Sequence, residues 1–280
     1  MELQWICVTD YKKYIMITVY VGAGLANRMF QYSFALYLKN KGLNVNIDEH
    51  SFKPRFDFEN TKLSNVFNGI ELKESDYRKF RYPFSSKKIE KKILNYYHLI
   101  TEKLPDYRYI VRWTLDYLPD IYMKATPNCI FVGFWISYKY FNGIENQIKQ
   151  SFIFKDFSSK KNLEIATKIR GTNSVAVHFR KNVDYLKEHA DECTPQYYAN
   201  AIEYIKKHVD NPTFYFFSDN WDWVKENIHG VDYVPIDWNS PSGPESHCDM
   251  QLMSMCKHNI IANSTYSWWA AWLNENKNKI

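Results

Sequence analysis

Three short apolar runs constrain the fold of this chain most strongly, because each ends in polar residues and is followed by a segment with helical periodicity. The runs, each given with the polar residue that follows it, are 175–177 with His178, 214–217 with Ser218, and 260–262 with Asn263. Strands that alternate with helices form parallel sheets, whose ligands lie outside the carboxyl ends of the strands. The sequence therefore predicts three parallel strands and a ligand site where they end.

The polar clusters contain residue types that bind phosphorylated ligands. These candidates are His178, Arg180, Lys181, Ser218, Asp219, Asn263, Ser264 and Thr265. Side chains alternate along a strand, so His178 and Arg180 are expected on one side and Phe179 on the other. Arginine binds phosphate through two parallel hydrogen bonds, and the N–H groups at a helix start attract anions. The same pattern is also typical of a solvated strand end and of helix capping at Ser264.

Alternating strands and helices continue through the C-terminal half. Predicted helices lie at 164–170, 220–228, 249–256 and 266–275, another begins at Thr194-Pro195, and a strand lies near 231–236. Proline directly after a capping residue is typical of a helix start. Asp249 lies at the start of its helix, where a carboxylate either stabilises the helix dipole or accepts paired N–H groups such as those of guanine.

The N-terminal half has the same alternation in a less regular form. A strand is predicted at 14–21, a helix capped by Asn27 follows, and the next strand lies near 43–47. Residues 130–132 form a further predicted strand. The Lys- and Tyr-rich segment 71–125 is interpreted as several amphipathic helices.

Length and composition fit two α/β domains. The 280 residues suffice for an N-terminal domain at 1–150 and a C-terminal domain at 151–280, with the site expected in the cleft between them. The net charge of +5 favours a small anionic ligand, without the concentrated basic stripe of a nucleic-acid-binding protein. The aromatic fraction of 18% also suits a non-catalytic carbohydrate-binding protein, an alternative that stays open.

Cysteine usage and hydropathy bear on the location of the protein. The five cysteines are scattered and form no Cys-x-x-Cys pair, which favours reduced thiols in the cytoplasm. The apolar run at 14–21 is far shorter than a ~20-residue membrane span, and the N-terminus has no signal-peptide pattern. The segment Lys87–Lys92 is more typical of a solvated helix face than of peripheral contact with the inner face of a membrane.

A glycine-containing loop, Gly22-x-Gly24-x-x-Asn27, lies between a predicted strand and a predicted helix, as in dinucleotide-binding loops. Asp48 lies about 20 residues further on, where that motif has an acidic residue. Asn27 replaces the third glycine, which is needed for close packing of helix on strand. Three alternatives stay open: a nicotinamide-dependent oxidoreductase, a plain tight turn, and a loop that places Asn27 at a ligand.

Several stretches together resemble glycosyltransferase family 11, the α-1,2-fucosyltransferases. Residues 249–273 are similar to the family's C-terminal signature, and residues 22–32 are similar to its N-terminal Gly-Gly-Leu-Gly-Asn-Gln-Met-Phe-Gln-Tyr. Residues 133–141, residues 216–223 and the His-x-Arg core at 178–180 also fit. The resemblance covers nearly the whole chain.

The resemblance implies a GT-B fold of two Rossmann-like domains facing across a cleft. It further implies inverting transfer of L-fucose from GDP-β-L-fucose to a galactoside 2-hydroxyl, with no metal ion and no further cofactor. By the same resemblance, Arg180 contacts the β-phosphate, with Lys181 assisting. The other residues that it implies are His178 and Asp249 at guanine, Ser264 and Thr265 at phosphate, and Asn27 near the transferred sugar.

The sequence departs from the family in three places. The usual His-x-Arg-Arg-Gly-Asp-Tyr has one extra residue here, so Asn182, Val183 or Asp184 takes the place of the aspartate. Asp184 is a candidate for the base that an inverting displacement requires. The family's Asn-Gln pair is Asn27-Arg28. The chain also ends soon after the last predicted helix, where relatives carry a further segment, so a short or truncated member is an open alternative.

Overall fold

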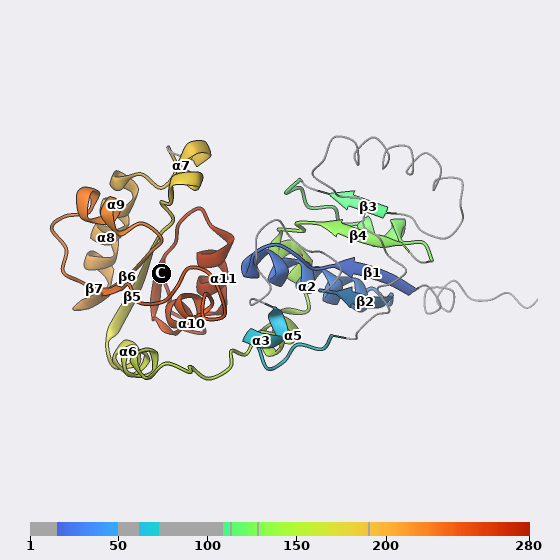
Figure 1. Ribbon diagram of the computed structural model, residues 1–280, viewed down its shortest axis with the longest axis horizontal. Helices are drawn as coiled ribbons and strands as arrows, with labels where there is room; N and C mark the ends of the chain where they lie inside the picture. The colour runs from blue at the N-terminus through green and yellow to red at the C-terminus, as the bar shows by residue number, and fades with distance from the viewer. Residues whose placement is uncertain (1–15, 50–61, 73–108, 113, 128, 190) are drawn as a thin grey trace, which may run out of the picture. The chain divides into compact units, whose positions relative to one another are not determined.

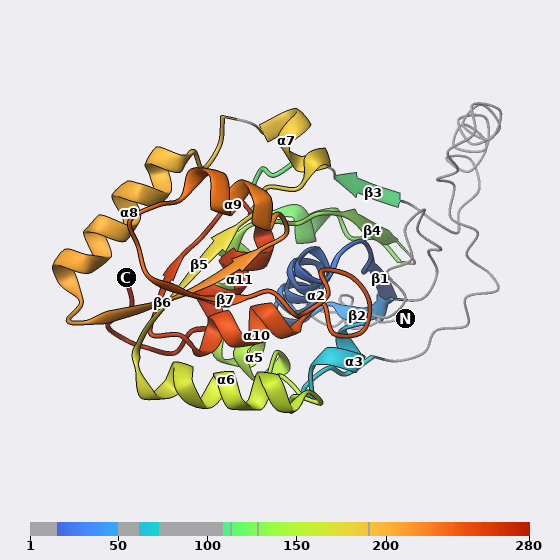
Figure 2. The same ribbon diagram turned by 60° about the vertical axis from the view of Figure 1, so that its left-hand side comes forward.

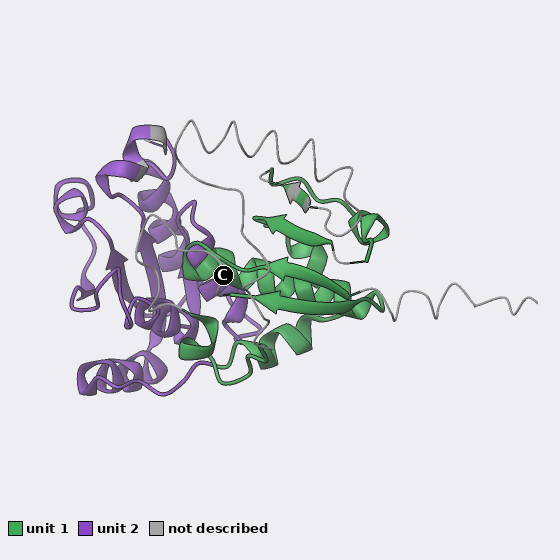
Figure 3. Ribbon diagram, turned by 45° about the vertical axis from the view of Figure 1, so that its right-hand side comes forward, with its two compact units in different colours: residues 1–153 green, residues 154–280 purple. Residues whose placement is uncertain are grey.

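The computed structural model describes residues 16–49, 62–72, 109–112, 114–127, 129–189 and 191–280, drawn in colour in Figure 1 and Figure 2. Within these ranges, no helix is long and apolar enough to span a bilayer. The chain divides into two compact units, Met1–Ile153 and Phe154–Ile280 (Figure 3). The segment Lys87–Lys92 and most of the helices expected between 71 and 125 lie outside the described residues.

The first unit contains a parallel sheet of four strands in the order β2-β1-β4-β3 (Figure 1). The strands are β1 (Met16–Tyr20), β2 (Asn44–Asp48), β3 (Tyr109–Arg112) and β4 (Ile130–Gly133). Pairing of Val19 with both Ile47 and Phe131 sets the register of β2, β1 and β4. The expected strands near 14–21, 43–47 and 130–132 are therefore confirmed.

Helix α2 (Leu25–Asn40) supplies much of the core of this unit. Its Phe34 stacks on Trp135, with ring centroids 4.1 Å apart. The helix begins three residues earlier than predicted, because Gly24 rather than Asn27 is the N-cap, and Asn27 lies in the first turn. The remaining helical segments of the described part are α3 (Leu63–Val66), η3 (Ile121–Lys124), η4 (Tyr138–Phe141) and α5 (Glu145–Ser151).

Strand β3 corrects the purely helical interpretation of the segment 71–125. Its residues Tyr109-Ile110-Val111 are of the β-branched and aromatic types that favour strands, and they pair in parallel with β4. The run is too short and too close to polar residues for its periodicity to separate strand from helix. The sequence interpretation was therefore wrong at this point.

The second unit contains a parallel sheet in the order β7-β6-β5-β8 (Figure 2). Its strands are β5 (Asn173–Phe179), β6 (Pro212–Ser218), β7 (Tyr233–Ile236) and β8 (His258–Ile260). Strand β5 lies between β6 and β8, which confirms that the three apolar runs form neighbouring parallel strands. Phe179 is in register with Ser218, and Val177 with Ile260, so the polar clusters follow at the same edge of the sheet.

Six helices accompany this sheet. They are α6 (Lys160–Gly171), α7 (Val183–His189), α8 (Pro195–His208), α9 (Trp221–Asn227), α10 (Cys248–Met255) and α11 (Thr265–Leu273). Helices α8 and α9 bury Tyr198, Ile202 and Val224 against Val177 and Phe179 on one face of the sheet. Helices α10 and α11 lie on the other face (Figure 1). The predicted start at Thr194-Pro195 is confirmed, since the Thr194 hydroxyl accepts from the Tyr197 N–H.

Candidate functional site

The carboxyl edge of the second sheet gathers most of the predicted site residues. Arg180 follows β5 and pairs with Asp219 after β6, with Nη1 and Oδ2 2.8 Å apart. The His178 ring lies 5.8 Å from the Tyr266 ring in the first turn of α11. Segments that are far apart in the sequence thus meet where three parallel strands end, as expected for ligand sites in such sheets.

Asp219 holds Arg180 and the chain around it. Its carboxylate accepts from the Lys181 backbone N–H at 2.6 Å, from Asn182 Nδ2 at 2.9 Å, and from Arg180. The Asp219 side chain is 9% exposed, whereas that of Arg180 is 41% exposed. Asp219 was predicted as a ligand contact; in the structure it pairs with Arg180, whose guanidinium stays partly exposed.

His178 is a buried, neutral imidazole. Burial, assisted by the nearby Arg180 charge, lowers its pKa to about 3. Among the described residues, none hydrogen bonds with its Nδ1. The backbone carbonyl of His178 accepts from Tyr198 Oη at 3.0 Å, which fixes the strand beneath the ring. A buried polar atom without a partner is costly, so this nitrogen suits a bond to a bound ligand.

Asp249 lies in the first turn of α10, close to Tyr266. Its Oδ1 accepts from Asn239 Nδ2 at 2.7 Å. Burial raises its pKa to about 7, and the Asn239 hydrogen bond opposes this shift. Tyr266 Oη accepts from the Met250 N–H at 2.8 Å, and the pKa of Tyr266 is raised first by burial and then by the charge of Asp249. Tyr266 therefore joins the His178 side of the site to the start of α10.

Sequence reasoning did not name Tyr266 or Asn239 as site residues. A signal existed for Tyr266, because it is an aromatic residue one position after the polar cluster 263–265. Asn239 gave none, since it lies in a Ser-, Pro- and Gly-rich loop and reaches Asp249 only in the folded chain.

The start of α11 is a capped helix N-terminus. Ser264 is the N-cap, and its hydroxyl accepts from the Tyr266 N–H at 3.3 Å. Thr265 is the first helical residue. The capping alternative for Ser264 is therefore correct, and the oriented N–H groups of the first turn remain the feature that attracts an anion.

Three predicted phosphate contacts have other partners. Ser218 Oγ donates to the Asn220 carbonyl at 3.0 Å and shapes the turn before α9. Asn263 donates its backbone N–H to Cys193 Sγ and its side-chain amide to the Glu192 carboxylate. Lys181 is 1% exposed, and its Nζ donates to the Glu192 carbonyl at 2.8 Å.

Strand alternation explains why Lys181 does not assist Arg180 directly. Phe179 and Lys181 are two residues apart, so both face α8 and α9, while His178 and Arg180 face the other way. The Lys181 ammonium lies 4.7 Å from the centre of the Trp223 ring. Burial lowers the pKa of Lys181. The prediction that Lys181 binds phosphate is therefore not supported by its position.

Asp184 is poorly suited to act as a base. It lies in the first turn of α7, with a fully solvated carboxylate 2.8 Å from Lys187 Nζ. The hydrogen bond with Lys187 lowers the pKa of Asp184, which makes the carboxylate less basic. Because of the one-residue insertion, Asn182 and Val183 were alternatives to Asp184 for the place of the family's aspartate. In the structure, Asn182 donates to Asp219, and Val183 is the first residue of α7.

In the first unit, the Gly22–Gly24 loop is held rigidly beside Asn27. The Gly22 N–H donates to Gln31 Oε1 at 2.7 Å, and Gln31 Nε2 donates to the Gly133 carbonyl at 2.8 Å. A Cβ at Gly22 would overlap the Tyr20 hydroxyl, so a larger residue there would displace the Tyr20 ring. These bonds join the ends of β1 and β4 and fix the turn from which α2 starts.

Arg28 stabilises the same loop from inside. Its Nε donates to the Ala23 carbonyl at 2.7 Å, and Ala23 has a positive φ of 72°. Its Nη1 pairs with Glu49 Oε1 at 3.0 Å, and both side chains are buried. Arg28, which stands where the family has glutamine, therefore acts within the fold, and the partly buried Asn27 is the loop's candidate ligand contact.

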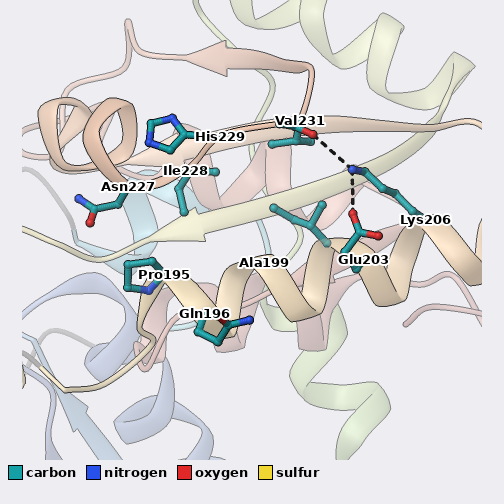
Figure 4. A pocket seen from close by; sticks show the side chains of 11 residues that line it. Pro195, Gln196, Ala199, Glu203, Lys206, Asn227, Ile228, His229 and Val231 are labelled. Atoms are coloured by element: carbon teal, nitrogen blue, oxygen red, sulfur yellow. Dashed lines mark hydrogen bonds and ion pairs between the residues drawn. The ribbon is translucent and has the colours of Figure 1, made fainter.

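A cavity of about 280 Å³ lies elsewhere in the second unit (Figure 4). Its walls include Pro195, Ala199 and Glu203 of α8 and Ile228 and His229 after α9. Neither Arg180 nor His178 lines it. The cavity is therefore separate from the candidate site.

Sequence similarity to a known family and to individual proteins identifies this chain as a glycosyltransferase. Residues 4–279 match Glycosyl transferase family 11. The chain belongs to this family. It is 31% identical to an Escherichia coli protein named alpha-1,2-colitosyltransferase, over 92% of this chain and 87% of that protein. A stretch of 35 residues, 12% of each chain, is 71% identical to the Escherichia coli O-antigen biosynthesis glycosyltransferase WbnK.

Solved structures show that this family 11 member has a GT-B-like fold. The fucosyltransferase NodZ from Bradyrhizobium superposes with a TM-score of 0.51, at 12% identity and 92% coverage of both chains. POFUT1 in complex with GDP superposes with a TM-score of 0.50, at 12% identity, over 95% of this chain and 96% of that one. Two α/β units with parallel sheets agree with the fold that the sequence resemblance implied.

The central position of Asp219 predicts a large effect on stability. Asp219→Ala removes the acceptor of three hydrogen-bond donors and should lower the free energy of unfolding by about 2–4 kcal/mol. Asp184→Ala removes a solvated carboxylate and is the matched control, with an unchanged urea midpoint expected. Equal midpoints for the two variants in urea unfolding would show that Asp219 does not organise this edge.

Proposed function

We propose that this family 11 glycosyltransferase transfers L-fucose from GDP-β-L-fucose to the 2-hydroxyl of a galactoside, in glycan or surface-polysaccharide synthesis. The observation that carries the proposal is the convergence of Arg180, His178, Asp249 and the N-terminus of α11 at one sheet edge. Similarity to a protein named alpha-1,2-colitosyltransferase supports an α-1,2 linkage, and similarity to an O-antigen glycosyltransferase supports a polysaccharide acceptor.

The charges of the site suit a departing nucleoside diphosphate. Breaking the sugar–phosphate bond leaves negative charge on GDP and partial positive charge on the sugar ring. Arg180 is held in place by Asp219, so its guanidinium needs little reorganisation to stabilise that charge. The first-turn N–H groups of α11 add a second positive pole. We therefore propose that turnover needs no metal ion and continues in the presence of a chelator.

The nucleobase is assigned to the neighbouring side chains. An ionised Asp249 accepts the two adjacent N–H groups of a guanine edge, as carboxylates do for paired donors. The unpartnered Nδ1 of His178 supplies one more hydrogen bond. The Tyr266 ring lies beside His178, which offers the base an aromatic surface.

The first unit is assigned to the acceptor side. The rigid Gly22–Gly24 loop presents Asn27, whose amide is suited to hold a sugar hydroxyl or the leaving oxygen. Asn27 is not a base at neutral pH, and the pairing of Asp184 with Lys187 makes that carboxylate a weak alternative. We propose a cytoplasmic enzyme, in which the scattered cysteines stay reduced.

A second donor is favoured by one finding. The relative that matches 92% of this chain is named for colitose, a sugar that differs from fucose by the absence of the 3-hydroxyl. Incubation with GDP-fucose or GDP-colitose and a panel of galactosides, with the linkage read by NMR, compares the two donors directly. A new α-1,2 linkage from GDP-fucose supports the proposal, transfer from GDP-colitose alone selects the second donor, and transfer of neither sugar contradicts both.

Arg180 is expected to dominate turnover. Arg180→Ala should lower kcat with GDP-fucose by about 10²–10³, as loss of a charge-stabilising donor typically does. Arg170→Ala removes an arginine from the last turn of α6 and is the control, with wild-type kcat expected. Near-normal turnover of Arg180→Ala in a steady-state assay would refute this assignment.

Asp249 should make GDP binding depend on pH. Its raised pKa of about 7 means that the carboxylate is mostly protonated at pH 6 and mostly ionised at pH 8. Only the ionised form accepts both guanine donors, so GDP should bind about tenfold more weakly at pH 6 than at pH 8. GDP binding to Asp249→Asn, measured by calorimetry at both pH values, gives the part of the pH dependence that comes from ionisation of GDP's own phosphate. An equal pH dependence in both proteins rules out this role.

A further inference from the structure

A short segment between α7 and α8, residues 192–193, contacts the loops on both sides of the proposed diphosphate site. The Glu192 backbone carbonyl accepts from Lys181 Nζ at 2.8 Å, and its carboxylate accepts from Asn263 Nδ2. Cys193 Sγ accepts from the Asn263 backbone N–H at 3.2 Å. One segment therefore bonds the residue after Arg180 and the residue before the cap Ser264.

The bonds on the Arg180 side leave Lys181 little freedom. Its side chain is buried over the Trp223 ring, and its backbone N–H donates to Asp219 Oδ1 at 2.6 Å. Its backbone carbonyl accepts from Asn220 Nδ2 at 2.8 Å. Because Arg180 is the preceding residue, these bonds fix the backbone from which its guanidinium extends.

The α11 side of the site is held by the same region. Tyr197, in the first turn of α8, donates its hydroxyl to the Ile261 carbonyl at 2.7 Å. Together with the two bonds made by Asn263, this contact fixes the loop that runs from β8 into α11. The first-turn N–H groups of α11 therefore have a set position relative to segment 192–193.

We propose that Lys181 and Glu192 are positioning residues that hold the Arg180 guanidinium and the α11 N-terminus at a fixed separation for the diphosphate. This inference rests on the proposed function. Electrostatic stabilisation of a leaving group depends on donors that are already in place, within about 0.5 Å of the productive geometry. A buried ammonium contributes little to stability compared with an apolar side chain of similar volume. The role that we infer for the Lys181 ammonium is therefore to hold the backbone next to Arg180 in place.

The Lys181 side is tested by Lys181→Met, which keeps an unbranched side chain over Trp223 and removes the donor. kcat with GDP-fucose should fall at least tenfold, KM for the donor should change less than threefold, and the unfolding temperature should stay the same or rise. The control is Lys206→Met, which removes a lysine that pairs with Glu203 and donates to the Gly230 carbonyl (Figure 4). Wild-type kcat in Lys181→Met, or a kcat loss matched by a lower unfolding temperature, overturns the proposal.

The Glu192 side is tested by Glu192→Ala, which removes the carboxylate bonded to Asn263 and His189 and keeps the carbonyl that binds Lys181. If both sides act through one segment, the kcat effects of Lys181→Met and Glu192→Ala should be less than additive in the double variant. Full additivity would show that the two residues act separately.

A measurement without nucleotide separates this inference from the proposed function. In GDP-free protein, Glu192→Ala should speed amide hydrogen exchange at residues 264–266, while Lys206→Met leaves it unchanged. Equal exchange in Glu192→Ala and wild type overturns the positioning role. If wild type neither binds GDP nor transfers fucose, the proposed function fails, and the exchange result still decides whether segment 192–193 fixes the α11 N-terminus.

Discussion

The carboxylate of Asp219 is the group on which the candidate site depends. It lies at the end of β6, beside the end of β5, and accepts hydrogen bonds from Arg180, from the Lys181 backbone and from Asn182. A partly exposed arginine is usually mobile, because its long side chain gains conformational entropy in water. The hydrogen-bonded carboxylate removes that freedom from Arg180 and leaves its charge accessible to an anion.

The pleat of β5 decides which of two adjacent cations faces the ligand. Arg180 continues the face of His178, whereas Lys181 continues the face of Phe179 and is buried beneath α8 and α9. The same two residues therefore have different roles: the arginine provides charge, and the lysine provides position. This division follows from the two-residue period of a strand and from the position of α8 and α9 on the face of Phe179 and Lys181.

The fold was largely predictable from the sequence, because the apolar runs of β5, β6 and β8 have clear ends and the Thr194-Pro195 start is a strong local signal. Strand β3 was not, since a four-residue run in a Lys- and Tyr-rich segment has no distinctive period. The gathering of His178, Arg180 and Asp219 at one sheet edge was predictable from their place along or after the strands. The partners of Lys181, Asn263 and Asp219 were not, because they lie 11 to 71 positions away in the chain and meet only through packing.

Thermal unfolding with GDP, NAD or free galactosides tests the central claim most directly, since a ligand that binds the folded state raises its unfolding temperature. The site described above has fixed positive groups for a diphosphate and a carboxylate for guanine, and so predicts that GDP stabilises the protein while NAD leaves it unchanged. Stabilisation by NAD or by a glycan, with no effect of GDP, would contradict the account.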